Sequence, residues 1–205
     1  MSSIPSMSQR ELTDLLSELR ISCDLLPASL ALAEHVHGEQ RRAGGGPYLE
    51  EHVYPITADV ARYLFAVDPV VVVTAVLIAI LHDTIEDSRD VTRATLAKRF
   101  GPDIASGIAT LSKPSKRDGQ ATGESAPSEA RYVAGISSAP REVRIVKIFD
   151  RLNNLSAVHQ RPSEKRRQYL AETRAHYLDL ARGVDDALAR RMEALVDTQE
   201  ESLRD

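Results

Sequence analysis

The stretch that decides the fold is "DPVVVVTAVLIAILHDTIEDS", residues 68–88, in which an almost wholly aliphatic run ends in a histidine and three acids. The run from Val70 to Leu81 is far shorter than the ~20 apolar residues that a bilayer crossing requires. It therefore predicts a helix buried in a protein core. Asp68 and Pro69 are typical of a helix start, with Asp as the cap and Pro at the first helical position. We expect this helix to carry His82 and Asp83 at its C-terminal end.

Helical periodicity extends along most of the chain. No stretch alternates with period two, so the sequence predicts an all-α fold, and 205 residues fit one domain, residues 1–205, better than two. The run RRAGGGP, residues 41–47, predicts a loop because glycine and proline interrupt helices. Residues 112–128 are almost without apolar side chains and predict a mobile loop. Besides the central helix, the expected helices cover about 8–20, 26–40, 54–66, 92–100, 102–111, 141–159, 163–182 and 185–199.

Composition limits the classes of function. A net charge of −4 argues against a protein that mainly binds nucleic acid. Cys23 is the only cysteine, which excludes a disulfide framework within the chain and fits the cytoplasm. The first ten residues lack the pattern of a signal peptide, and no segment predicts membrane insertion. The amphipathic first helix (about 8–20, expected at the periphery) and the last helix leave a homodimer open.

The acids after Leu81 raise a problem of charge. Residues three and four apart on a helix are neighbours, so His82, Asp83, Glu86 and Asp87 are expected on one face. Like charges repel there, and a helix C-terminus is the wrong pole to offset them. A divalent cation would do so. Imidazole with carboxylates suits Mn, Fe, Co, Ni or Zn better than Ca or Mg.

Two further residues extend this hypothesis. His52 lies in "PYLEEHVYP" close to the glycine-rich turn, and Asp150 lies in "VRIVKIFDRLNNL" among apolar residues, where an unpaired carboxylate would be costly. Each also has a simpler interpretation: a solvated helix end for the His82-Asp83 pair, a satisfied histidine for His52, and a local ion pair between Asp150 and Arg151. Their order in the chain favours a metal site over these separate explanations.

That order resembles the HD superfamily of metal-dependent phosphohydrolases. The segments "GEQRRAGGGPYLEEH", "LIAILHDTIEDS", "LAKRFGPDIASGIATLSK" and "VKIFDRLNNL" are similar, in sequence and order, to the hydrolase domain of the RelA/SpoT homologues. These enzymes remove pyrophosphate from the 3′ position of guanosine tetra- and pentaphosphate. The resemblance covers about residues 26–181 and includes nothing like a synthetase domain, as in the small alarmone hydrolases. It implies an HD-type helical bundle, a ppGpp-like nucleotide as substrate and Mn²⁺ as cofactor.

The resemblance also implies roles for individual residues. The metal ligands would be His52, His82, Asp83 and Asp150, the catalytic acids Glu86 and Asp87, and the substrate-binding residues Arg41, Arg42, Lys147 and Asn154, with Lys113 matching a further basic residue.

Departures from the family pattern leave the substrate open. The family usually has Tyr-Ile-x-His-Pro, whereas this chain has an additional residue before His52 and two residues between it and Pro55, so we expect the loop to bulge. Ala43 and Ala157 stand where the family often has a basic residue and a threonine. The alternatives are an HD hydrolase of another nucleotide, such as an adenosine alarmone, and a nucleotide-binding regulator or antitoxin-like protein of low turnover. The Glu86-Asp87 pair speaks against the regulator, because binding alone requires no additional acids.

Overall fold

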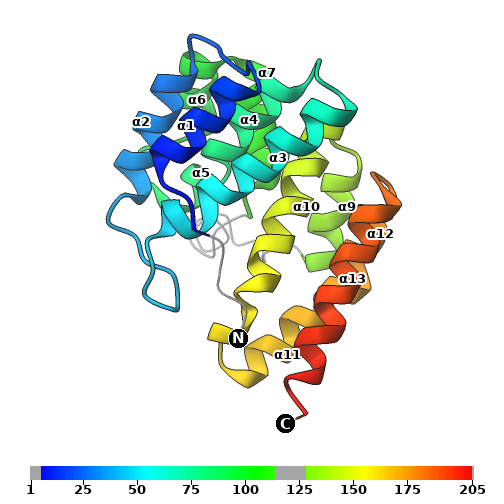
Figure 1. Ribbon diagram of the computed structural model, residues 1–205. Coiled ribbons are helices and arrows are strands. Elements are labelled where there is room, and N and C mark those ends of the chain that lie inside the picture. Colours follow the sequence, from blue (N-terminus) through cyan, green and yellow to red (C-terminus); the bar gives the residue numbers. More distant parts are fainter. Residues whose placement is uncertain (1–5, 114–127, 205) are drawn as a thin grey trace, which may run out of the picture.

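A computed structural model describes residues 6–113 and 128–204 (Figure 1). Within these ranges the regular structure is helical, and the only β-type pairing is an isolated bridge between Arg41 and Pro47. The predicted all-α fold class is therefore confirmed. Of the predicted mobile loop, residues 114–127 lie outside the described ranges.

The N-terminal helices end close to the predicted positions. Ser8 caps helix α1 (Gln9–Glu18), and its side chain forms a capping box with Glu11. Helix α2 (Leu26–His37) ends before Gly38, earlier than the predicted residue 40. After the glycine-rich loop, a π-helical turn η1 (Leu49–Val53) continues directly into α3 (Tyr54–Val67).

The central apolar run forms α4 (Val72–Leu81), and nearly all of it is buried. A helix that is apolar all round belongs inside a core. The predicted start at Asp68-Pro69 is wrong, because Asp68 ends α3 and its carboxylate accepts a hydrogen bond from Arg141 Nη1 at 3.1 Å. The expectation that one helix continues through the acids is also wrong. Helix α4 ends at Leu81, and a separate short helix α5 (Thr84–Asp87) follows.

Helix α7 (Pro102–Leu111) packs against α4, and α6 (Arg93–Phe100) packs in turn against α7. Thr92 caps α6, and Gly101, at φ +92°, allows the turn into α7, as predicted. Gly107 permits the close approach of α7 to the core, since a Cβ there would lie 2.7 Å from Ile78 Cδ1.

The C-terminal part contains one helix that the sequence analysis missed, α9 (Glu129–Ser137), which Ser128 caps and which buries an apolar stripe. Helix α10 (Arg141–Ser156) begins where predicted but ends three residues before the predicted residue 159, and a separate short 3₁₀ turn η2 (Val158–Gln160) follows it. The helix predicted over 163–182 is divided by a π-helical turn. The remaining elements are α11 (Ser163–Glu172), η3 (Thr173–Tyr177), α12 (Leu178–Arg182) and α13 (Asp186–Glu201).

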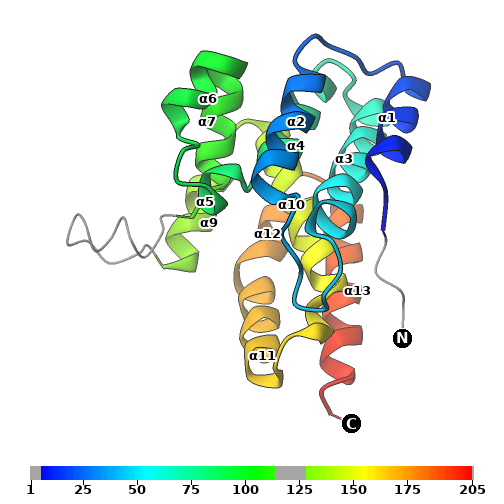
Figure 2. The same cartoon turned by 90° about the vertical axis from the view of Figure 1, so that its left-hand side faces the viewer.

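Helix α10 lies at the centre of the helical bundle. It packs against α3, α4 and α7 on one side and against α12 and α13 on the other (Figure 1). Seen from the side, α6 and α7 stand apart from α11 and α13, and α10 lies between them (Figure 2). The apolar faces of α1 and α13 are buried within this chain, against α3 and α10 respectively. None of the described helices is both long enough and apolar enough to cross a membrane.

Candidate metal centre and substrate pocket

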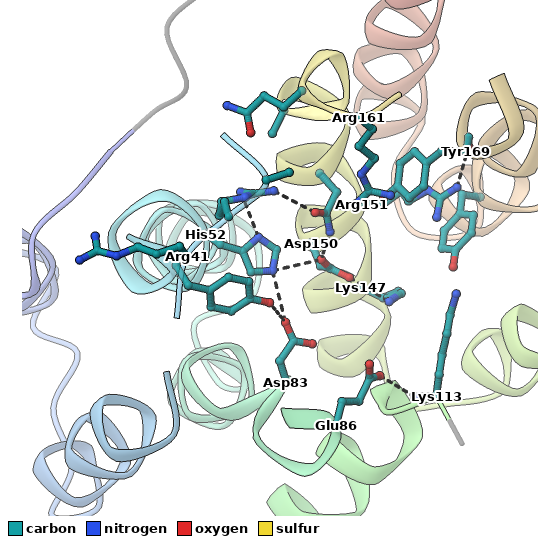
Figure 3. Close-up of a pocket in the computed structure, with 17 residues that line it drawn as sticks. Arg41, His52, Asp83, Glu86, Lys113, Lys147, Asp150, Arg151, Arg161 and Tyr169 are labelled. Atoms are coloured by element: carbon teal, nitrogen blue, oxygen red, sulfur yellow. Dashed lines mark hydrogen bonds and ion pairs between the residues drawn. The ribbon is translucent and has the colours of Figure 1, made fainter. Parts of the chain in front are cut away.

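A cavity of about 420 Å³ opens where the glycine-rich loop, α5, α10 and α11 converge. Its lining comes from segments that are far apart in the sequence, and it includes His52, Asp83, Glu86 and Asp150 (Figure 3). The helix ends and turns that surround it therefore bring most of the predicted site residues to one place.

Two histidines and an aspartate form a cluster at this cavity, and two of the three, His52 and Asp83, line it. Asp83 Oδ2 lies 3.1 Å from His82 Nε2 and 3.4 Å from His52 Nε2. These three residues offer ligand atoms that all lie within 4.8 Å of one another, close enough to hold one metal ion. Asp150 Oδ1 lies 3.6 Å from His52 Nε2 and so faces the same space.

The π-helical turn explains how His52 reaches the centre. The additional residue before His52 was expected to make the loop bulge, but η1 absorbs it within a helix. Single-turn π-helices of this kind accommodate an inserted residue and are frequent at functional sites. His52 is 2% exposed and lies on helical backbone rather than on a loop.

The break between α4 and α5 orients the other two residues. His82 Nδ1 donates to the carbonyl of Ala79 at 2.8 Å, which directs Nε2 toward Asp83. Burial opposes charge on both groups. The Asp83 carboxylate nevertheless raises the pKa of His82 to about 9, and His82 and His52 hold the pKa of Asp83 well below its usual range. The Asp83 carboxylate thus stabilises a positive charge beside it.

The donor set fits a divalent cation. His82 Nε2 is buried and has no hydrogen-bond partner, although a carboxylate oxygen lies 3.1 Å away. Buried polar atoms are nearly always satisfied, so an exception needs an explanation. A cation between His52, His82 and Asp83 would satisfy this nitrogen, and mixed imidazole and carboxylate ligands suit a first-row transition metal.

Asp150 has a partner within the chain. Lys147 Nζ lies 2.8 Å from Asp150 Oδ2, and Asn154 Nδ2 donates to Asp150 Oδ1 at 2.6 Å. Asp150 is therefore paired without a metal, and its partner is Lys147 rather than Arg151. Burial alone would raise the pKa of Asp150, but Lys147 and the two histidines lower it.

The acids of α5 do not crowd together as predicted. Glu86 accepts a hydrogen bond from the backbone N–H of Lys113, at the end of α7. Asp87 accepts one from Gln40 Nε2 at 3.1 Å, on the side of α2. The helix break separates both from Asp83, which points toward the histidines. Glu86 remains at the pocket beside the cluster, and partial burial raises its pKa.

The two predicted arginines behave differently. Arg42 donates from Nη1 to the backbone oxygen of Glu51 at 2.9 Å and from Nη2 to Asn154 Oδ1 at 3.0 Å. Arg41 also lines the cavity, but Figure 3 shows its side chain pointing away from the cluster. Arg42 is therefore tied to α10, whereas Arg41 is exposed.

Several residues of the wall were not predicted. The guanidinium of Arg151 stacks between two tyrosine rings, 3.5 Å from the centroid of Tyr169 and 4.0 Å from that of Tyr177, and Arg161 lies 4.5 Å from the Tyr169 centroid. Tyr48 donates a hydrogen bond to Asp83. These arginines and tyrosines carry no local pattern in the sequence. The packing of α11 and η3 against α10 brings Tyr169 and Tyr177 to Arg151, whereas Tyr48 comes from the end of the glycine-rich loop.

The fold and this centre define a class of protein. The chain belongs to the HD domain family, whose model matches residues 29–185. Among curated proteins it is 28% identical over 173 residues to guanosine-3′,5′-bis(diphosphate) 3′-pyrophosphohydrolase of Aquifex aeolicus (strain VF5), with 84% of this chain and 23% of that protein covered. It is 32% identical over 157 residues to the GTP pyrophosphokinase rsh of Brucella ovis, with 77% of this chain and 20% of that protein covered. The chain thus spans about a fifth of the length of these relatives.

A solved structure shares the fold. It comes from work describing a metazoan orthologue of SpoT that hydrolyses ppGpp and plays a role in starvation responses. The TM-score is 0.67, and the match covers 87% of this chain and 97% of that one at 20% sequence identity. At this identity the likeness concerns the fold alone.

Proposed function

We propose that this protein is a metal-dependent phosphohydrolase that removes the 3′-pyrophosphate from guanosine tetra- and pentaphosphate, giving GDP or GTP and pyrophosphate. The observation that carries the proposal is the placement of the histidine and aspartate cluster beside a cavity whose wall is cationic and aromatic. Such a cavity matches a nucleotide with several phosphates. The activity named for the Aquifex relative supports the same substrate class.

His52, His82, Asp83 and Asp150 would hold the metal, for which we propose Mn²⁺. When bound, a divalent cation lowers the pKa of a water molecule and offsets charge on a phosphate oxygen. Manganese accepts both imidazole nitrogen and carboxylate oxygen, in keeping with this donor set.

Side chains of the protein would transfer protons and bind the substrate. Glu86 would accept a proton from the attacking water, since its raised pKa brings it closer to neutral pH than an ordinary glutamate. Asp87 would assist the departing ribose 3′ oxygen. Lys147 and Arg151 would bind phosphate oxygens, because both cations line the cavity and Arg151 is fixed by its tyrosines. Arg42, with Asn154, would hold the nucleoside.

Another nucleotide is the second candidate substrate. Ala43 and Ala157 line the cavity where the family often has larger polar side chains, so the pocket offers few groups there that could distinguish guanine from adenine. A nucleotide-binding regulator with low turnover is the third candidate. It predicts binding without release of pyrophosphate.

The test is release of pyrophosphate from guanosine tetraphosphate by metal-stripped protein, with and without added manganese. We expect manganese-dependent turnover that Asp83→Ala and Glu86→Ala both abolish. Asp179→Ala, which changes an exposed acid of α12, is the matched control and should keep full activity. Absence of turnover by folded, manganese-loaded protein would contradict the proposal, and a panel of adenosine nucleotides would then separate the other two candidates.

Two further proposals concern the cellular compartment and the oligomeric state. The lone free cysteine agrees with action in the cytoplasm. A homodimer stays a prediction, which light scattering of the purified chain would test.

A further inference from the structure

Asn153 connects the candidate metal centre to the nucleotide side of the cavity, although no family motif pointed to it. It lies on α10 between Leu152 and Asn154, and its side chain makes three hydrogen bonds. Its Oδ1 lies 2.8 Å from His52 Nδ1 and 2.6 Å from Arg42 Nη1, and its Nδ2 donates to the backbone oxygen of Glu51 at 3.2 Å.

The chemistry of these neighbours fixes the orientation of the amide. A backbone oxygen only accepts hydrogen bonds and a guanidinium only donates them. The Nδ2 group of Asn153 must therefore face Glu51, and Oδ1 must face Arg42. With the amide reversed, two donors would meet at Arg42 and two acceptors at Glu51.

This orientation determines which nitrogen of His52 carries the proton. Asn153 Oδ1 has no hydrogen, so His52 Nδ1 must donate to it. Arg42 Nη1 lies 3.4 Å from the same nitrogen, but its two hydrogens already go to Glu51 O and Asn153 Oδ1. With the proton on Nδ1, the lone pair is on Nε2, which lies 3.4 Å from an oxygen of Asp83 and 3.6 Å from one of Asp150.

We propose that Asn153 is a positioning residue that holds His52 in its Nδ1–H tautomer, so that Nε2 is ready to bind the cation, and that the same amide oxygen ties Arg42 to this ligand. The inference rests on the proposed metal site. Outer partners of this kind fix the ring of a ligating histidine and increase its basicity, and losing one typically weakens metal binding by about 10–100-fold. His82 has a backbone carbonyl in the equivalent role.

The experiment compares wild type, Asn153→Leu and Asn153→Asp, with Ser156→Ala as the matched control. Ser156 is half-buried on the same helix, and its hydroxyl donates only to the carbonyl of Asn153. The first readout is manganese affinity, measured by competition with a chelator. The second is the tautomer of His52 in the metal-free protein at alkaline pH, read from ¹⁵N chemical shifts and assigned by the loss of its signals in His52→Gln.

We expect Asn153→Leu to bind manganese about 10–100-fold more weakly and to lose the predominance of the Nδ1–H form. Asn153→Asp keeps the acceptor that faces His52 and Arg42 but loses the donor to Glu51 O, so it should recover most of both properties, and Ser156→Ala should match wild type. A purely structural role predicts no such recovery. The inference is overturned if Asn153→Leu keeps wild-type affinity, if Asn153→Asp is as weak as Asn153→Leu, or if the tautomer does not change.

These outcomes are separable from the proposed activity. Wild type that binds manganese and shows the expected dependence on Asn153, yet releases no pyrophosphate, would contradict the proposed substrate and leave the role of Asn153 intact.

Discussion

Replacing Lys147 with methionine removes the positive partner of a buried carboxylate while keeping most of the side-chain volume. Lys147 Nζ lies 2.8 Å from Asp150 Oδ2, and the two side chains are 12% and 8% exposed. At this distance and an effective dielectric constant of about 20, the attraction is about 6 kcal/mol before desolvation is counted. The variant leaves Asp150 with Asn154 as its hydrogen-bond donor and His52 at 3.6 Å.

The remaining partners put the expected loss at the low end of the range for breaking a buried ion pair. That range is about 3–5 kcal/mol, so Lys147→Met should lower the free energy of unfolding of the metal-free protein by about 3 kcal/mol. For a chain of this length, such a loss corresponds to a fall in melting temperature of about 6–12 °C. A cation at the centre supplies positive charge near Asp150, so saturating manganese should reduce the loss to about 1 kcal/mol.

The assay is urea unfolding followed by circular dichroism, in chelator and in saturating manganese. Lys165→Met is the matched control, since Lys165 is an exposed lysine of α11 and its replacement should change stability by less than about 0.5 kcal/mol. If Lys147→Met lost the same unfolding free energy with and without manganese, the idea that the cation binds beside Asp150 would be refuted. A loss below about 1 kcal/mol in chelator would refute the importance of the ion pair itself.

Three other predictions follow from the site and the core. Glu86→Gln and Asp87→Asn should each lower turnover by about 10²–10⁴-fold while leaving manganese affinity nearly unchanged, which steady-state kinetics and metal titration would show; a parallel fall in affinity would assign these acids to metal binding instead. Because the metal-free centre raises the pKa of His82 to about 9, a proton competes with the cation below that pH, so manganese affinity should fall by up to about tenfold for each pH unit from 8 to 6. Calorimetry in buffers of different ionisation enthalpy should detect the proton that is released when manganese binds. A manganese affinity that does not depend on pH would contradict competition between the cation and a proton on His82. Gly107→Ala should destabilise the protein by about 1–3 kcal/mol in thermal unfolding, since its Cβ would lie 2.7 Å from Ile78 Cδ1, whereas Gly135→Ala on α9, where nothing lies within 4 Å, should not.

The sequence by itself determined most of the helices and predicted which residues would form the site. Helical periodicity, the aliphatic run of α4 and the cap at Thr92 predicted most helices, because these signals depend on neighbours within a few positions. The resemblance to HD phosphohydrolases identified the segments that converge on the cavity. Helix α9 was missed because its short apolar stripe follows a long polar segment.

Only the tertiary structure decided how these residues meet. It placed His52 in a π-helical turn, separated Asp83 from the acids of α5 by a helix break, and paired Lys147 with Asp150. It also brought Asn153 behind His52, a contact between residues 101 positions apart in the chain. Periodicity specifies which face of a helix is buried, but the partner of a polar group on that face depends on how distant helices pack, and that information is spread over the whole sequence.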